Sequence, residues 1–293
     1  MEATHFQNEI LVETSIKSSR ERAWDLMFNP IHIMKWNAAS DDWHTTFADV
    51  DLRVGGTLIY HMASKDGKYG FDFSGTFTDL ELNKLAAYTL EDGRKVRVEF
   101  AVEDDQVGIK QYFEPESQNP PDFQQKGWQA ILDNFKKYSE GNPSDVMRFE
   151  TIIEATVEQV YTKMIDKEVY DKWTSVFNET SSFEGDWNKG SEIYFIGLDS
   201  EGIKGGMVAE IFENRASQFI GIRHEGMLKG EEKIMSGPEV EPWKGCYECY
   251  TFRKEGNHCR LIVQLDAIES FKDYMNETWP KALTKLKETI ESV

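Results

Sequence analysis

The segment from Trp36 to His44 brings together residue types that could do acid–base chemistry or hold a ligand. His44 with Asp41 or Asp42 could form a proton-transfer pair. The alternative is a solvated loop, in which a His beside an Asp is expected by chance because the chain holds 52 acidic residues. Trp36, Trp43 and His44 could instead form the mouth of a pocket, or the tryptophans could be core residues beside a turn. We assign no catalytic residue.

A second candidate set consists of Cys246, Cys249, His258 and Cys259, whose residue types match zinc ligands. The segment is typical of a β-hairpin with its turn at residues 255–257. Residues three apart on a strand point to opposite faces, so Cys246 and Cys249 would diverge. We therefore predict no metal site and interpret these cysteines as small hydrophobic strand residues.

Inward-facing apolar residues are better candidates for a site. The sequence has no Gly-x-Ser-x-Gly elbow, no His-Glu-x-x-His helix and no phosphate loop, so no cofactor is predicted. Strand parity places Leu58 inside with several aromatic residues, which line either a void or a solid core. Tyr60 and Trp128 each carry a polar atom that needs a partner when buried. The predicted ligand-contacting residues are Trp36, Trp43, His44, Tyr60, Met62, Phe71, Phe73, Phe100, Trp128 and Leu132.

These residues would be positioned by an ordered set of strands and helices in the first half. The predicted strands are 9–16, 57–62, 70–80, 96–100 and 107–114. The predicted helices are 20–28, capped by Ser18 or Ser19, a short one from Asn29-Pro30 to Trp36, and 121–138. Asp66-Gly67 and Asp92-Gly93 predict hairpin turns. Trp128, Leu132 and Phe135 form one apolar stripe on the last helix.

A sheet with one apolar face and a long helix with one apolar stripe must bury both against each other. The predicted fold class is therefore α+β, with a curved antiparallel sheet wrapped around a long C-terminal helix. Large aromatic residues on a curved sheet rarely fill the enclosed space completely, so an apolar cavity is expected between helix and sheet.

The same pattern occurs twice along the chain. Lys35-Trp36 corresponds to Lys172-Trp173, and residues 56–60 correspond to residues 190–194. The helix stripes also correspond, with Trp128, Leu132 and Phe135 matching Trp279, Leu283 and Leu286. Matched blocks in the same order indicate duplication of a whole domain.

The repeat predicts the domain boundaries. Domain 1 would span residues 1–140 and domain 2 residues 146–293, joined by a linker rich in Gly, Asn, Pro and Ser at 138–145. The wider spacing in the second copy places an insertion at about residues 225–244. Its glycines and prolines predict a loop, which would serve as a lid over the second cavity.

Composition excludes several classes of partner. The net charge of −19 repels phosphate backbones and anionic lipid headgroups, so no nucleic acid partner is expected. No apolar stretch approaches the roughly 18 residues of a membrane helix, and no signal peptide is readable, so no membrane insertion is expected. The three cysteines lie in one late segment, unlike a secreted disulfide framework. A cytoplasmic location is predicted.

Several segments resemble the bacterial homologues of the activator of the heat shock protein 90 ATPase. They are residues 36–44, 52–56, 70–76, 92–96 and 127–135. That family belongs to the START-like (SRPBCC, polyketide cyclase-like) superfamily, whose helix-grip fold is also called Bet v-like. The resemblance covers about residues 9–140. The second half is similar only in general pattern, because it lacks the Asn-Ala-Ala-Ser-Asp-Asp run and the Gly-Trp-Gln motif.

The resemblance implies a tandem of two helix-grip domains and a cavity for an apolar or amphipathic small molecule. It does not imply one reaction, because the superfamily includes lipid carriers, hormone receptors, aromatic cyclases and chaperone cofactors. Our first hypothesis is non-catalytic binding of a hydrophobic small molecule. The second is a module that acts on a chaperone of the heat shock protein 90 class. The third is a cyclase or hydrolase that uses the cavity as a reaction vessel.

Overall fold

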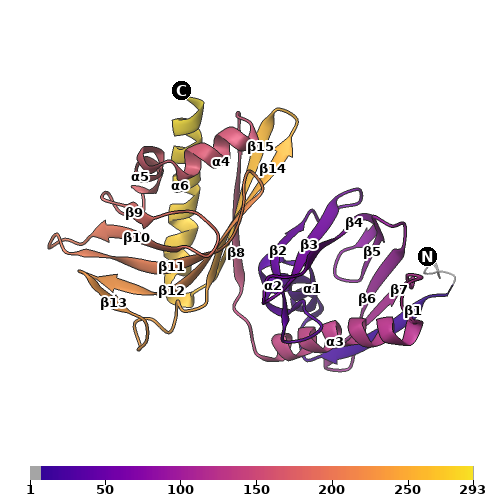
Figure 1. Ribbon diagram of the computed structural model, residues 1–293. Helices are drawn as coiled ribbons and strands as arrows, with labels where there is room; N and C mark the ends of the chain where they lie inside the picture. Colours follow the sequence, from indigo (N-terminus) through magenta and orange to yellow (C-terminus); the bar gives the residue numbers. More distant parts are fainter. Residues whose placement is uncertain (1–7, 293) are drawn as a thin grey trace. The chain divides into compact units, whose positions relative to one another are not determined.

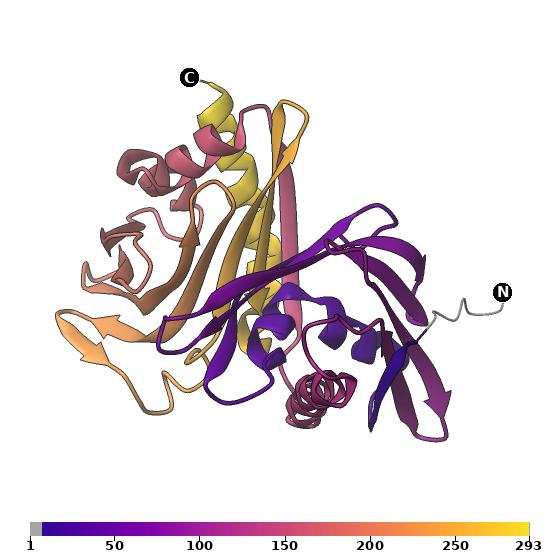
Figure 2. The ribbon, with the colours of Figure 1, turned by 45° about the vertical axis from the view of Figure 1, so that its right-hand side comes forward.

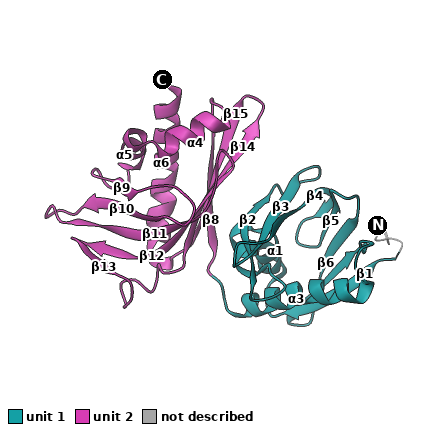
Figure 3. Ribbon diagram, in the orientation of Figure 1, with its two compact units in different colours: residues 1–143 teal, residues 144–293 magenta. Residues whose placement is uncertain are grey.

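The computed structural model describes residues 8–292 of the chain. It divides into two compact units, Met1–Pro143 and Ser144–Val293 (Figure 3). Both units follow one order of elements: a strand, two short helices, a run of antiparallel strands and a long helix (Figure 1). The protein is therefore a tandem of two α+β helix-grip domains, as the sequence predicts.

Unit 1 is built on one antiparallel sheet of seven strands in the order β1-β7-β6-β5-β4-β3-β2. The sheet curls over α3, its long C-terminal helix (Figure 2). Its elements are β1 (Ile10–Ile16), α1 (Arg20–Phe28), α2 (Pro30–Trp36), β2 (Trp43–Val50), β3 (Thr57–Ser64), β4 (Gly70–Glu81), β5 (Leu85–Leu90), β6 (Lys95–Glu103), β7 (Gln106–Phe113) and α3 (Pro121–Glu140).

Local sequence signals set the helix bounds in unit 1. The Ser19 hydroxyl accepts a hydrogen bond from the backbone N–H of Arg22 at 3.1 Å, as an N-cap does. Asn29 ends α1 and caps α2, whose first residue is Pro30. The predicted helices at 20–28 and from Pro30 to Trp36 are confirmed.

The two predicted hairpin turns are also confirmed. Gly67 (φ +72°) lies between β3 and β4, and Gly93 (φ +87°) lies between β5 and β6. These positive φ angles strain residues with a Cβ, which explains the glycine of each Asp-Gly pair. The edge strand β2 is not among the predicted strands, and β5 is predicted only as the strand before the Asp92-Gly93 turn, without bounds.

Unit 2 repeats the topology with the order β8-β15-β14-β12-β11-β10-β9, and β13 pairs with β12 outside this path. Its long helix α6 runs along the inner face of the sheet (Figure 1). The elements are β8 (Val146–Ile153), α4 (Val157–Ile165), α5 (Lys167–Thr174), β9 (Ser182–Gly185), β10 (Glu192–Leu198), β11 (Lys204–Arg215), β12 (Phe219–Lys229), β13 (Glu232–Ile234), β14 (Tyr247–Glu255), β15 (His258–Asp266), a 3₁₀ turn η1 (Glu269–Phe271) and α6 (Lys272–Glu291).

The prediction of a loop over residues 225–244 is wrong for its first part. Residues 225–229 complete β12 and form a short hairpin with β13, in which Met227 pairs with Ile234. The remaining segment, 235–246, is irregular, and its Trp243 ring packs on Phe271 with centroids 4.6 Å apart. Backbone pairing accounts for the hairpin despite the glycines that flank it.

The apolar stripes of both long helices face their own sheets. Leu132 and Phe135 of α3 are 1% and 0% exposed, and Leu283 and Leu286 of α6 are 3% and 0% exposed. Burial of these side chains supplies the main attraction between helix and sheet in each unit. Among the described residues, no helix is both long and apolar enough to cross a membrane.

Candidate functional site

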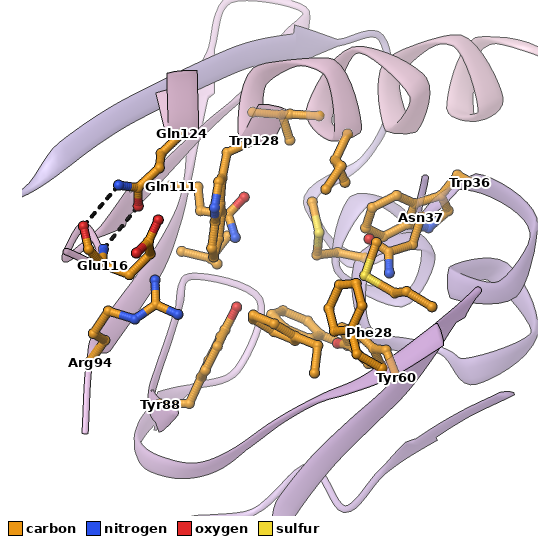
Figure 4. Close-up of a pocket in the computed structure, with 17 residues that line it drawn as sticks. Phe28, Trp36, Asn37, Tyr60, Tyr88, Arg94, Gln111, Glu116, Gln124 and Trp128 are labelled. Atoms are coloured by element: carbon orange, nitrogen blue, oxygen red, sulfur yellow. Dashed lines mark hydrogen bonds between the residues drawn. The ribbon is translucent and has the colours of Figure 1, made fainter. Parts of the chain in front are cut away.

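A cavity of about 270 Å³ lies inside unit 1 (Figure 4). Its walls come from α1 and α2, from strands β3 to β7 with their connections, and from the inner face of α3. A cavity of about 150 Å³ holds a benzene molecule, so this one has room for roughly two rings.

Aromatic rings form the apolar body of the cavity. Tyr60 and Phe73 stack at 5.9 Å with an interplanar angle of 22°, and Phe73 meets Trp128 edge-on at 5.9 Å. Trp128 is itself held by Phe113, whose ring stacks on it at 4.1 Å. The Trp36 indole donates to the Leu26 carbonyl oxygen at 2.9 Å, so its polar atom is satisfied. The rings are thus fixed in place around the space.

Polar side chains gather at the other end, where Tyr88, Arg94, Gln111, Glu116 and Gln124 line the cavity (Figure 4). Gln124 Nε2 donates to the Glu116 carbonyl oxygen at 2.9 Å, and the Glu116 N–H donates to Gln124 Oε1 at 2.9 Å. This pair fixes the start of α3 to the loop after β7. The site therefore has a polar end and an apolar body, as small-molecule sites commonly do.

The Arg94 guanidinium is oriented by its neighbours. Arg94 Nε donates to Asp92 Oδ2 at 2.7 Å, while the Nη1 contact to the Glu114 carbonyl oxygen is long, at 3.5 Å. The Glu116 carboxylate accepts from the backbone N–H of Gln118 and from Asn119. These hydrogen bonds lower the pKa of Glu116, so it is a carboxylate at neutral pH.

Both cavity tyrosines are neutral donors at physiological pH. Burial raises the pKa of Tyr60 well above its ordinary value, and the nearby Tyr88 adds to this effect. Burial likewise raises the pKa of Tyr88, although its hydrogen bond with Gln111 lowers it in part. Their hydroxyl groups can therefore donate to a ligand.

The structure places most of the predicted ligand contacts in this cavity. Phe71 lies at its rim, with 49% of its surface exposed and its ring 5.9 Å from that of Trp43. The predicted residues that line the cavity are Trp36, Tyr60, Met62, Phe71, Phe73, Trp128 and Leu132.

Three predicted contacts lie elsewhere. Phe100 packs in the core, where its ring centroid is 5.3 Å from Trp24 and 6.2 Å from Phe28. Trp43 and His44 begin β2 and line a separate, more open hollow on unit 1. For Phe100, strand parity could not decide, because a cavity wall and a solid core share the inner face of the sheet.

Sequence reasoning missed the polar end of the cavity. The sequence predicts a hairpin turn at Asp92-Gly93 and a helix that includes Gln124, and neither pattern indicates a ligand contact. One signal was available for Gln111, which shares a strand face with the buried residues Ile109 and Phe113. A polar residue in an inward-facing apolar row needs a partner, and such a residue is a site candidate.

Residues 17–140 match the family described as activator of Hsp90 ATPase homolog 1-like protein. The AHSA1-like protein from Aeromonas hydrophila, known from a solution structure, is 46% identical over 46% of this chain and 93% of its own, with a TM-score of 0.44. The chain belongs to this family. Chr148 from Cytophaga hutchinsonii is likewise 46% identical, over 46% of this chain and 94% of its own, with a TM-score of 0.42.

The part of the chain that matches the AHSA1-like family lies wholly in unit 1, which holds the cavity. Over nearly the whole chain, the di-domain ARO/CYC StfQ from the steffimycin biosynthetic pathway is 9% identical, covering 97% of this chain and 98% of its own with a TM-score of 0.46. A comparison with curated proteins finds no match.

The interior of unit 2 differs around Trp279, the counterpart of Trp128. The Trp279 ring lies 5.1 Å from Phe177, 6.0 Å from Phe149, 6.1 Å from Tyr250 and 6.2 Å from Trp173. These rings pack around the Trp279 indole. The interiors of the two copies are therefore not equivalent.

Two of the three late cysteines belong to the β14–β15 hairpin, whose turn at residues 255–257 is as predicted. Cys249 and Cys259 are buried strand residues, and Cys246 lies just before β14. Burial raises the pKa of the Cys259 thiol to about 12. Within residues 8–292, no cluster of His, Cys, Asp and Glu has the arrangement of a metal site.

Proposed function

We propose that unit 1 binds a small amphipathic molecule, with an apolar body of up to two rings and one polar group, without changing it chemically. The observation that carries this proposal is the cavity itself, which combines an aromatic body with hydrogen-bond donors at one end. Native interiors otherwise pack at crystal-like density, so an unfilled space of this size has a cost that ligand binding would offset.

The lining suggests how such a ligand would lie. Its apolar body would contact Tyr60, Phe73 and Trp128, which are already held by ring contacts. Its polar group would accept hydrogen bonds from the Tyr88 hydroxyl and from Arg94 Nη2, because Arg94 Nε donates to Asp92 and Nη1 contacts the Glu114 carbonyl oxygen. A carboxylate or a carbonyl group fits this set of donors best.

The size of the cavity limits the affinity. A two-ring ligand that buries about 250 Å² of apolar surface gains about 6 kcal/mol at about 25 cal/mol per Å². The restricted motion of the bound molecule offsets part of this binding free energy, and hydrogen bonds at the polar end contribute further favourable free energy. Dissociation constants from micromolar to millimolar are expected for simple probes.

Titration of the full chain with 2-naphthoic acid tests the proposal. The Ile131→Trp variant fills the cavity from α3, and Lys126→Trp places the same ring on the exposed side of that helix as a control. We expect Ile131→Trp to weaken binding at least tenfold and Lys126→Trp to leave it unchanged. Equal binding by all three proteins would reject the cavity as the site, and native mass spectrometry would reveal any co-purified ligand.

Family membership supports a second candidate function. The AHSA1-like description names activation of the Hsp90 ATPase, so unit 1 would act on a chaperone of that class. A pull-down and an ATPase assay with the cognate chaperone test this candidate, and absence of both binding and stimulation would remove it. We further propose a cytoplasmic site of action, which the three cysteines support because none of them forms a disulfide among the described residues.

A further inference from the structure

The inner face of the unit 2 sheet carries three polar side chains, His224, Glu248 and Tyr250, which we call the unit 2 polar cluster. The Tyr250 hydroxyl donates to Glu248 Oε1. Glu248 Oε2 lies 3.7 Å from His224 Nε2, which is longer than a hydrogen bond. One carboxylate oxygen is thus held by a phenol, while the other faces an imidazole at a distance.

The cluster is buried and leaves polar atoms without partners. His224 and Tyr250 are 9% and 3% exposed. His224 Nδ1 is buried with no hydrogen-bond partner in the protein, and so is the indole nitrogen of Trp279. The Trp279 ring lies 6.1 Å from that of Tyr250. A buried polar group without a partner carries a desolvation cost, so each of the two calls for an explanation.

The fold does not require polar groups at these positions, as a comparison with unit 1 shows. Phe100 packs on Trp24 of α1 at 5.3 Å, and Phe252 packs on Tyr161 of α4 at 5.6 Å, so Phe100 and Phe252 correspond. Stepping back two residues at a time along each strand aligns Tyr250 with Val98 and Glu248 with Val96. Both valines are buried, at 1% and 0% exposed, so apolar residues satisfy the fold there.

The polar residues of the unit 1 cavity are in turn replaced by apolar ones. Tyr88 pairs with Val96 across the sheet, and the residue that pairs with Glu248 is Ile222. Gln111 pairs with Val98, and the residue that pairs with Tyr250 is Val263. In each of these pairs, the position that is polar in unit 1 is apolar in unit 2, and the position that is apolar in unit 1 is polar in unit 2. Loss of an ancestral site alone would not place a carboxylate where the fold accepts valine.

The charged and titratable groups that face Glu248 come from three elements. His224 lies on β12, Tyr250 on β14 and Tyr170 on α5. Burial raises the pKa of Tyr250 well above its ordinary value, and so does the adjacent Glu248. Burial and then Glu248 also raise the pKa of Tyr170. Both phenols stay protonated, so the Glu248 carboxylate is the acceptor of the group.

Solvent reaches the cluster near the irregular segment 235–246. The side chain of Glu248 is 20% exposed, and that of His224 is 11% exposed. The His224 N–H donates to the Cys246 carbonyl oxygen at 2.9 Å, and the Gly245 N–H donates to the His224 carbonyl oxygen at 2.8 Å. The end of the segment is therefore tied directly to the cluster that it borders.

We propose that the unit 2 polar cluster is a second ligand site, for a small aromatic molecule that carries a hydrogen-bond donor such as a phenolic hydroxyl. The donor of the ligand bonds to Glu248 Oε2. The aromatic ring of the ligand packs against the rings of Tyr170, Trp279 and Phe195. The unit 1 cavity offers donors to its ligand, whereas this site offers an acceptor. The two domains would therefore select ligands of opposite hydrogen-bonding sense.

Nuclear magnetic resonance of the full chain with p-cresol and p-xylene tests the proposal, because these probes differ only in a hydroxyl or methyl group. The readout is the imidazole signal of His224, which is identified among the six histidines by its loss in His224→Gln. We expect saturable shifts with p-cresol and at least fivefold weaker binding of p-xylene. The Ile131→Trp background excludes a contribution from the unit 1 cavity.

Matched variants assign the effect to the carboxylate. Glu248→Gln should weaken p-cresol binding at least fivefold and leave the affinity for p-xylene unchanged. Glu239→Gln, at an exposed position, should change the affinity for neither probe. If Glu248→Gln fails to fold, Glu248→Val carries the residue type of unit 1 and should give the same loss. Equal affinity for both probes, p-cresol binding that survives loss of the carboxylate, or no shift of His224 with either probe would each overturn the proposal.

Discussion

Two matched leucines distinguish a real cavity from a solid core. Leu132 on α3 and Leu283 on α6 each lie four residues after the corresponding tryptophan, and they are 1% and 3% exposed. Leu132 lines the unit 1 cavity, whereas Leu283 belongs to the core cluster of unit 2. Truncation of each to alanine removes the same atoms from different surroundings.

The expected costs follow from those surroundings. Leu→Ala in a core costs about 2.7–5.0 kcal/mol and rises by about 24 cal/mol for each Å³ of cavity created. Leu132 already faces the empty space of about 270 Å³, so fewer packing contacts are lost there. We expect about 3 kcal/mol for Leu132→Ala and about 4 kcal/mol for Leu283→Ala.

Hydrogen exchange of buried amides measures the two costs separately, because a two-unit chain has no single free energy of unfolding. Amides of β7 report on unit 1 and those of β15 on unit 2. Leu82→Ala, at a residue with 72% exposure, is the control and should stay within about 0.5 kcal/mol of the unchanged protein. A cost for Leu132→Ala equal to or above that for Leu283→Ala would refute the reasoning that the space beside Leu132 is empty.

Three further predictions concern thiols, pH and backbone packing. At pH 8 a thiol reagent should label the partly exposed Cys246 and spare Cys259, because burial raises the pKa of Cys259 to about 12 and encloses it; mass spectrometry of labelled peptides measures this. Burial raises the pKa of Asp25, but hydrogen bonds with His32 and Asn29 outweigh it and lower the pKa below the ordinary value. The resulting stabilisation of the folded protein is present above the unfolded pKa of about 3.9 and is lost as pH falls through the folded pKa. Asp25→Asn removes this contribution, so the stability measured by circular dichroism should fall less steeply with decreasing pH in the variant. Gly206→Ala should destabilise unit 2 by more than about 2 kcal/mol in denaturant melts, because its Cβ would lie 2.0 Å from a backbone oxygen.

Each of these predictions has an outcome that contradicts it. Equal labelling rates for the two cysteines in the folded protein would show that Cys259 is not enclosed. An acid transition that Asp25→Asn leaves unchanged would remove Asp25 as a contributor. Gly205→Ala is the control for Gly206→Ala, since its Cβ would have an ordinary nearest contact of 3.5 Å, and equal costs for the two would contradict the steric argument.

Local signals made most of the elements of unit 1 predictable. Ser19, Asn29 and the two Asp-Gly pairs each act through their own backbone neighbourhood, so the chain order alone reveals them. The hairpin formed by β12 and β13 was missed because its evidence is strand pairing, and the glycines around it indicate loops when considered alone. The lid proposed for that region stays a prediction.

The sequence by itself determined that there are two copies of one α+β domain, because periodicity and repeated blocks depend only on order along the chain. Only the tertiary structure decided where empty space lies. Phe100 and Phe73 both occupy inward strand positions, yet one packs on Trp24 and the other lines the cavity. Arg94 and Gln124 meet at one end of the cavity because a β-turn and a helix start, far apart in sequence, converge there. Volume and convergence depend on all elements at once, which is the physical reason that no local pattern encodes them.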